Sequence, residues 1–149
     1  MFRDQSLILS DAQALTGNGD STNVYDQKAG VRDEDAAADI GTGNPLYLIV
    51  DIETAFAGAT GLTVGLRQAD ANKQNPVALG PQVTFSTAEL TTKGSRKVAY
   101  IPPEAVTQRE IFASYVLAGT ATAGAVNAWL SPTIEGYQEI KSGFTVETA

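Results

Sequence analysis

Apolar and polar side chains alternate along several segments of the chain. The clearest alternation runs over residues 46–53, where one face is apolar and the other becomes acidic at Asp51 and Glu53. Residues 61–68 repeat the pattern. Successive side chains of a strand point to opposite faces, so both segments are predicted strands with one buried face. The buried face of the first is expected to comprise Leu46, Leu48, Val50 and Ile52.

Shorter apolar segments and turn formers extend this pattern over most of the chain. Further strands are predicted over residues 22–27, 83–85, 98–101, 111–118 and 125–130. Gly, Pro and Asn gather between the segments, at residues 17–19, 41–45, 58–61, 80–81, 102–103 and 119–124. Such spacing is typical of all-β folds. We therefore predict an antiparallel two-sheet sandwich, jelly-roll-like, with about seven or eight strands.

The predicted sandwich occupies residues 20–131, between an N-terminal arm (1–19) and a C-terminal tail (132–149). Within the arm, residues 10–15 fit either one helical turn capped by Ser10 or an extended chain. Ser86 and Glu89 have the spacing of a capping box, which predicts one helical turn there.

Residues 29–38 have no strand pattern and are predicted to form an acidic surface loop. The acids at residues 33–35, with Asp39 nearby, do not have the spacing of an EF-hand. A solvated or interface-ordering loop is the better interpretation. Whether residues 29–39 bind a cation stays open at this stage.

Composition excludes much chemistry. The 149 residues make up one domain's length, and they include no His and no Cys. Thiolate nucleophiles, disulfides and the usual imidazole base are therefore excluded. The net charge of −7 disfavours nucleic-acid binding, since phosphates attract cationic surfaces. We also expect no membrane span and no secretory leader, because the apolar runs are too short.

The residues that remain suggest no catalytic set. Asp51 and Glu53 share a strand face two residues apart, which separates them by roughly 7 Å at the backbone. Paired carboxylates about 5–10 Å apart are the arrangement of glycosidases, but solvated strand faces commonly carry such pairs. Ser114 has no His to activate it. We expect no catalytic residue, no cofactor and no metal. A carbohydrate-binding or glycosidase jelly roll stays as an alternative.

Apolar side chains are more numerous than one small core requires. Trp129, Phe112 and Val116 fall on the strand faces opposite the predicted core, and apolar residues also occur in both terminal segments. Such positions favour oligomerisation or docking on a larger surface. The predicted partner-binding residues are Phe2, Leu7, Ile8, Phe112, Val116, Trp129 and Phe144. We expect binding through the terminal arms as well as the sandwich. The alternative is that the arms pack back on their own sandwich as extra strands, which would make the face of Phe112, Val116 and Trp129 the leading candidate.

A series of short motifs occurs in a characteristic order. They are SDAQALT (10–16), STNV (21–24), DIGTGNPLYL (39–48), AF (55–56), GLTV (61–64) and the Pro102-Pro103 turn. In this order they resemble the capsid cement family of Bordetella-type tailed bacteriophages. The resemblance extends to about Leu130 and is weaker from Ser131 onward.

This resemblance implies a jelly-roll decoration protein on the outer surface of the virion's capsid head. It implies a homo-oligomer, a dimer or trimer, that clamps neighbouring subunits of the phage major capsid protein without catalysis. The acidic composition suits the outside of a DNA-filled shell better than the inside. Another virion structural component, such as a head–tail connector or tail protein, stays as a further alternative.

Overall fold

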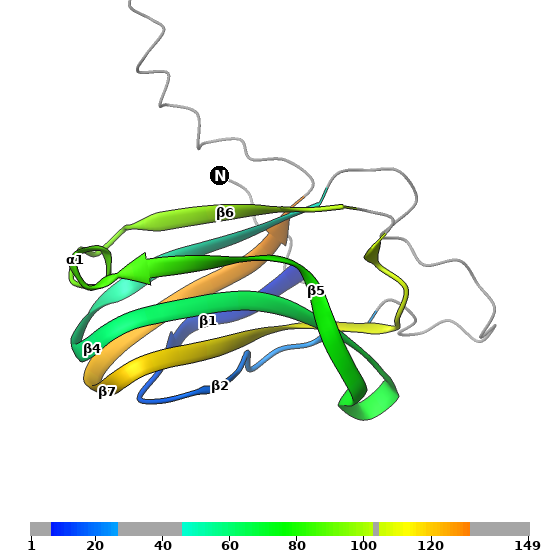
Figure 1. Cartoon of the computed structure of the whole chain (residues 1–149), viewed down its shortest axis with the longest axis horizontal. Coiled ribbons are helices and arrows are strands. Elements are labelled where there is room, and N and C mark those ends of the chain that lie inside the picture. Colours follow the sequence, from blue (N-terminus) through cyan, green and yellow to red (C-terminus); the bar gives the residue numbers. More distant parts are fainter. Residues whose placement is uncertain (1–6, 27–45, 103–104, 132–149) are drawn as a thin grey trace, which may run out of the picture.

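Antiparallel strands make up almost all of the computed structural model, which describes residues 7–26, 46–102 and 105–131 (Figure 1). Seven strands form one sheet in this part of the chain. They are β1 (Ile8–Ala14), β2 (Gly19–Asp20), β3 (Tyr25–Asp26), β4 (Leu46–Asp70), β5 (Gln74–Ser86), β6 (Arg96–Ile101) and β7 (Glu110–Ser131). A 3-10 turn, η2 (Ala71–Lys73), joins β4 to β5, and the short helix α1 (Thr87–Leu90) follows β5.

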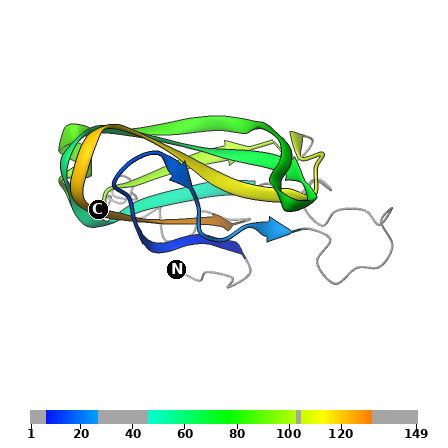
Figure 2. The same cartoon turned by 90° about the horizontal axis from the view of Figure 1, so that it is seen from below.

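Two exceptionally long strands organise the sheet. β4 has 25 residues and β7 has 22, and they pair from Tyr47↔Ser131 to Ala69↔Glu110. Ordinary strands have about 5–6 residues. The register between them shifts repeatedly from Ile52 to Gly61. Figure 2 shows that both strands bend here and pass from one layer into the other. One continuous sheet is thus folded over on itself.

Each half of the long strands contributes to a different layer. The first layer contains the N-terminal half of β4 and the C-terminal half of β7, flanked by β6 and β1. The second layer contains the other halves, flanked by β5 on one side and by β2 and β3 on the other. Strands β5 and β6 come close at Gly80 and Ile101, but no ladder joins them among the described residues. The sheet is therefore not closed.

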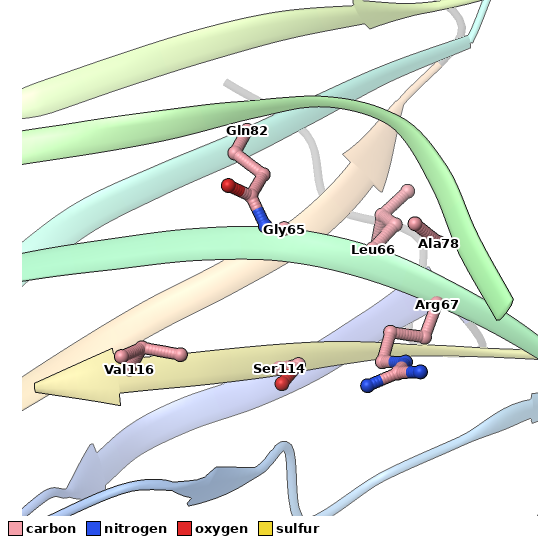
Figure 3. Close-up of a pocket in the computed structure, with 7 residues that line it drawn as sticks. All are labelled: Gly65, Leu66, Arg67, Ala78, Gln82, Ser114 and Val116. Carbon is pink, nitrogen blue, oxygen red and sulfur yellow. The ribbon is translucent and has the colours of Figure 1, made fainter. Parts of the chain in front are cut away.

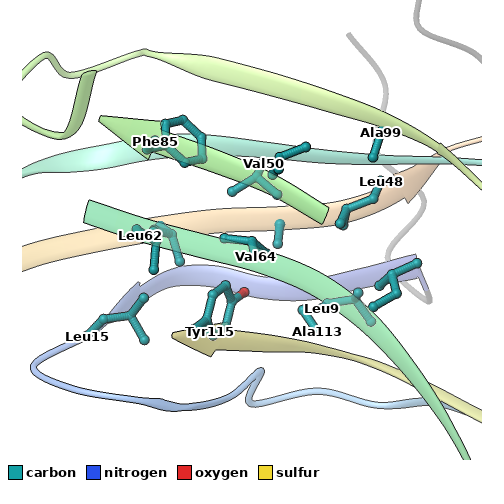
Figure 4. Packing of buried hydrophobic residues seen from close by; sticks show 14 of the residues in the cluster. Leu9, Leu15, Leu48, Val50, Leu62, Val64, Phe85, Ala99, Ala113 and Tyr115 are labelled. Atoms are coloured by element: carbon teal, nitrogen blue, oxygen red, sulfur yellow. The ribbon is translucent and has the colours of Figure 1, made fainter. Parts of the chain in front are cut away.

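The hydrophobic core lies between the two layers (Figure 4). Alternate residues of β4 and β7 point into it from both layers. Those from the first layer include Leu46, Leu48, Val50, Ile52, Val126, Ala128 and Leu130. Those from the second layer include Leu62, Val64, Leu66, Ile111, Ala113, Tyr115 and Leu117. The predicted core face of residues 46–52 is confirmed, since each of its four apolar residues is at most 4% exposed.

The predicted all-β antiparallel class is confirmed, whereas the described residues form one sheet and not the two separate sheets of a sandwich. Residues 46–53 and 61–68 were expected to be two strands joined by a turn, and they are halves of β4. Segments 111–118 and 125–130 are likewise halves of β7. Glycines at the bend explain the difference, because Gly58 has φ +93° and lets β4 curve without ending.

The N-terminal segment contributes to the sheet. Residues 10–15, which fit either a helical turn or an extended chain, lie mostly in strand β1, paired with β7. The expected strand over residues 22–27 is reduced to β3, while β2 lies just before it. The helical turn predicted at Ser86 is confirmed with both hydrogen bonds of its capping box.

A buried phenol links β1 to the core. Tyr115 is 1% exposed, and its hydroxyl shares a hydrogen bond with the Ser10 hydroxyl. Burial raises the pKa of Tyr115 to about 12, and the hydrogen bond with Ser10 offsets part of the rise. The neutral phenol therefore favours the folded state, because its pKa lies above the ordinary value of 10.0.

We expect the free energy of unfolding to depend on this phenol in alkaline solution. Its contribution is complete below pH 10 and is lost as the pH rises through about 12, by about 3 kcal/mol in all. Urea unfolding between pH 9 and pH 12 measures the decline, with Tyr115→Phe as control. If the free energy of unfolding fell equally in the wild type and in Tyr115→Phe, the prediction would be wrong, because the loss would then come from groups that both proteins share.

Candidate interaction surfaces

The predicted partner-binding residues are distributed over several parts of the protein. Phe2 and Phe144 lie outside the described residues. Leu7 directly precedes β1 and Ile8 is its first residue; both are partly buried, and Leu7 packs against the core. They therefore present only part of their apolar surface to a partner.

The three predicted residues on β7 do not form one face. Phe112 and Val116 lie on the outer face of the second layer, opposite the core residues Ile111 and Tyr115. Trp129 follows the bend in β7 and lies on the outer face of the first layer. The expectation of a common face is wrong, because the fold of the sheet separates the two halves of β7.

Their exposure separates these residues further. Val116 is 52% exposed, whereas Phe112 and Trp129 are 2% and 1% exposed. The Lys73 ammonium lies 4.6 Å from the centre of the Phe112 ring, and Arg96 lies 5.3 Å from that of Trp129. Of these three, Val116 alone offers substantial apolar surface to a partner.

The two carboxylates considered for glycoside hydrolysis are held in polar contacts within the first layer. Asp51 accepts a hydrogen bond of 2.9 Å from Arg96, on the neighbouring strand β6. Glu53 accepts one of 2.8 Å from the side chain of Asn127 and lies 3.9 Å from the Lys93 ammonium. These contacts give both carboxylates a structural role in joining β4 to its neighbours.

A shallow pocket of about 200 Å³ opens on the outer face of the second layer, across β5, β4 and β7 (Figure 3). Its lining residues are Gly65, Leu66, Arg67, Ala78, Gln82, Ser114 and Val116. Gly65 leaves the space that the side chain of Gln82 covers, since a Cβ at Gly65 would lie 2.8 Å from Gln82 Cγ. The pocket thus combines apolar walls with three polar side chains.

Arg67 is the charged residue of this pocket. It projects from β4 on the face opposite the core, where its backbone neighbours are Ala78 and Phe112. Its Nη2 donates a long hydrogen bond of 3.3 Å to the carbonyl oxygen of Pro76. Its Nε is buried and has no acceptor. A guanidinium has five N–H donors, and the bond to Pro76 is the one side-chain hydrogen bond that Arg67 makes within the described residues.

The described part of the chain has no cluster of side chains suited to a metal ion, because no three of its His, Cys, Asp and Glu side chains gather closely enough to hold one. The acids at residues 33–35 lie outside this part. No helix in the described ranges is long and apolar enough to cross a membrane.

The chain belongs to the Bbp16 family of phage proteins, named after a Bordetella phage protein. The family model matches residues 9–130, from the second residue of β1 to the penultimate residue of β7. The match therefore spans the described sheet except for its first and last residues, and the resemblance seen in the sequence motifs is confirmed at the level of the family. No curated protein matches the chain.

Sequence reasoning did not single out the Arg67 pocket. The alternation of residues 61–68 correctly placed Gly65 and Arg67 on the outward face of the strand. The feature in the sequence that could have indicated the pocket is a glycine two residues before an arginine, both on the outward face of the strand. The pocket also needs Gln82 and Ser114, which lie on β5 and β7 and come next to β4 through strand pairing.

Proposed function

We propose that this protein is a structural component of a tailed-phage virion. In this role it decorates the outer surface of the capsid head and cements neighbouring subunits of the major capsid protein. Membership of a phage protein family across almost the entire described sheet carries the proposal. The residues favour a binding role over catalysis, since the chain has no His or Cys and Asp51 and Glu53 are engaged with neighbouring side chains.

Attachment through several copies accounts for firm retention on a shell. A homo-oligomer, a dimer or trimer, presents the same surface several times, and linked weak contacts add to a strong one. The net charge of −7 favours the outside of the shell, away from the packaged DNA. We propose no direct contact with nucleic acid or membrane.

Co-sedimentation with capsids tests this function. Purified protein is mixed with expanded heads that lack it and with unexpanded heads, and the pellets are compared. We expect saturable binding to expanded heads, with on the order of hundreds of copies per particle, as a repeated capsid lattice provides. Absence of binding would overturn the proposal. Saturation at about six or twelve copies would instead indicate a connector at one vertex.

We expect the chain termini to contribute to this binding. Residues 1–6 and 132–149 lie outside the described residues, and each segment contains a predicted partner-binding residue, Phe2 or Phe144. The test deletes residues 1–6 in one variant and residues 132–149 in another. The N-terminal deletion ends at residue 6 because Leu9 is fully buried in the core. Each deletion is expected to weaken co-sedimentation while leaving the circular dichroism spectrum unchanged. Two folded deletion variants that sediment as well as the full chain would contradict the role of the termini.

A further inference from the structure

The cations of the described residues differ in one respect, which is whether a carboxylate lies beside them. Five of the six lie within 4 Å of one. These pairs are Lys73–Asp20, Lys93–Glu53, Arg96–Asp51, Lys97–Glu89 and Arg109–Asp26. Arg67 is the exception among the described cations. Arg67 thus lies in a surface pocket without a carboxylate from the described residues, in a chain that has 17 Asp and Glu residues in all.

The unused donors of Arg67 indicate which chemical group would fill the pocket. Its Nε–H is buried without an acceptor among the described residues, its Nη2 makes one long hydrogen bond, and no described carboxylate lies within 4 Å of it. A carboxylate matches the fork of a guanidinium with two parallel hydrogen bonds. The Ser114 hydroxyl and the Gln82 amide lie in the same lining and supply further donors. An Asp or Glu side chain is therefore the complementary group.

The walls of the pocket favour a protein as the source of this carboxylate. Val116 is 52% exposed at one end, and Ala78 also lines the pocket, so apolar contact surrounds the single cation. A nucleic-acid surface would require several cations facing the phosphates, and the net charge of −7 opposes it. The mixture of one arginine with small apolar walls is typical of protein interfaces.

A second copy of this chain, related by a two-fold axis, fits the pocket poorly. In a two-fold interface the same patch meets itself. None of the seven lining residues is acidic, so such a contact would place two Arg67 side chains near each other without a carboxylate between them. The positive charge of this pocket is therefore complementary to a different surface, one that carries a carboxylate.

We propose that the Arg67 pocket is a docking site for an Asp or Glu side chain of the major capsid protein. This inference rests on the proposed function. The second layer then lies with its outer face against the shell, and Val116 packs beside the ion pair. The contact adds specificity, because a partner without the carboxylate leaves the arginine buried and unpaired.

Co-sedimentation with expanded heads tests the site through four variants. Arg67→Gln removes the charge and is expected to weaken binding about tenfold or more per site. Arg67→Lys keeps the charge without the fork and should fall between Arg67→Gln and the wild type. Ser114→Glu places a carboxylate within the pocket, so we expect it to weaken binding as Arg67→Gln does. Lys97→Gln is the matched control, since it makes the same charge change at an ion pair on β6.

The outcomes separate this inference from the function on which it rests. If wild-type protein does not bind heads, the proposed function fails. If wild type and Arg67→Gln bind equally while both are folded, the function stands and the docking site is wrong. Sedimentation equilibrium supplies the second readout, because a change in the oligomeric state of Arg67→Gln would assign the pocket to a second copy. Raised salt should weaken binding of the wild type more than that of Arg67→Gln.

Discussion

We expect Val50→Asp to leave the protein largely unfolded at room temperature. Val50 is fully buried, and its strand is paired on both sides, with Lys97 of β6 and Ala128 of β7 as its partners. A buried carboxylate without a partner costs several kcal/mol, which approaches the total stability of about 5–15 kcal/mol of an ordinary domain. Circular dichroism and urea unfolding measure the loss.

A matched substitution on the same sheet isolates the effect of burial. Val116→Asp makes the same chemical change at a residue that is 52% exposed on β7. Its unfolding free energy should stay within about 0.5 kcal/mol of the wild type, as for most surface substitutions. If Val50→Asp melted at the same temperature as Val116→Asp, the assignment of Val50 to the core would be wrong.

Local patterns in the sequence predict the faces of the strands well. The alternation over residues 46–52 assigns the core residues correctly because the side chains of a strand point to opposite faces whatever the strand pairs with. The capping box at Ser86 and Glu89 is equally local, since both of its hydrogen bonds lie within four residues. These features require no knowledge of the rest of the chain.

The continuity of the long strands is not a local property. Glycines at residues 58 and 61 are typical of turns, and in this sheet they allow β4 to bend while it stays paired with β7. A turn and a bend use the same backbone freedom, so composition does not distinguish them. The same ambiguity led to the expectation that Trp129 and Val116 share a face, which the bend in β7 excludes.

The candidate docking site depends on long-range placement as well. Whether Arg67 has a carboxylate beside it depends on which acids the fold brings near. Each described acid that forms an ion pair does so with a cation other than Arg67. The apolar character of Val116 was visible in the sequence, and its exposure was not. The sequence therefore predicted an apolar contact on β7 but not the charged group that would give it specificity.

The bend itself gives the second large effect that we expect. Gly58 has φ +93°, and a Cβ there would overlap the carbonyl oxygen of Thr120 on β7. The obstacle is backbone, so no side-chain rotation relieves it. Gly58→Ala should therefore lose about 4 kcal/mol or more, from the strain of a left-handed conformation together with the steric clash.

Gly94→Ala separates the two causes of this loss. Gly94 has nearly the same φ, +91°, but a Cβ there meets nothing within 4 Å. This variant carries the conformational strain alone, about 1–2 kcal/mol, and urea unfolding of both proteins gives the difference. Equal losses would mean that β4 and β7 do not approach each other closely at the bend. A larger loss for Gly58→Ala is expected, because the folded sheet places the two long strands in backbone contact where they pass from one layer to the other.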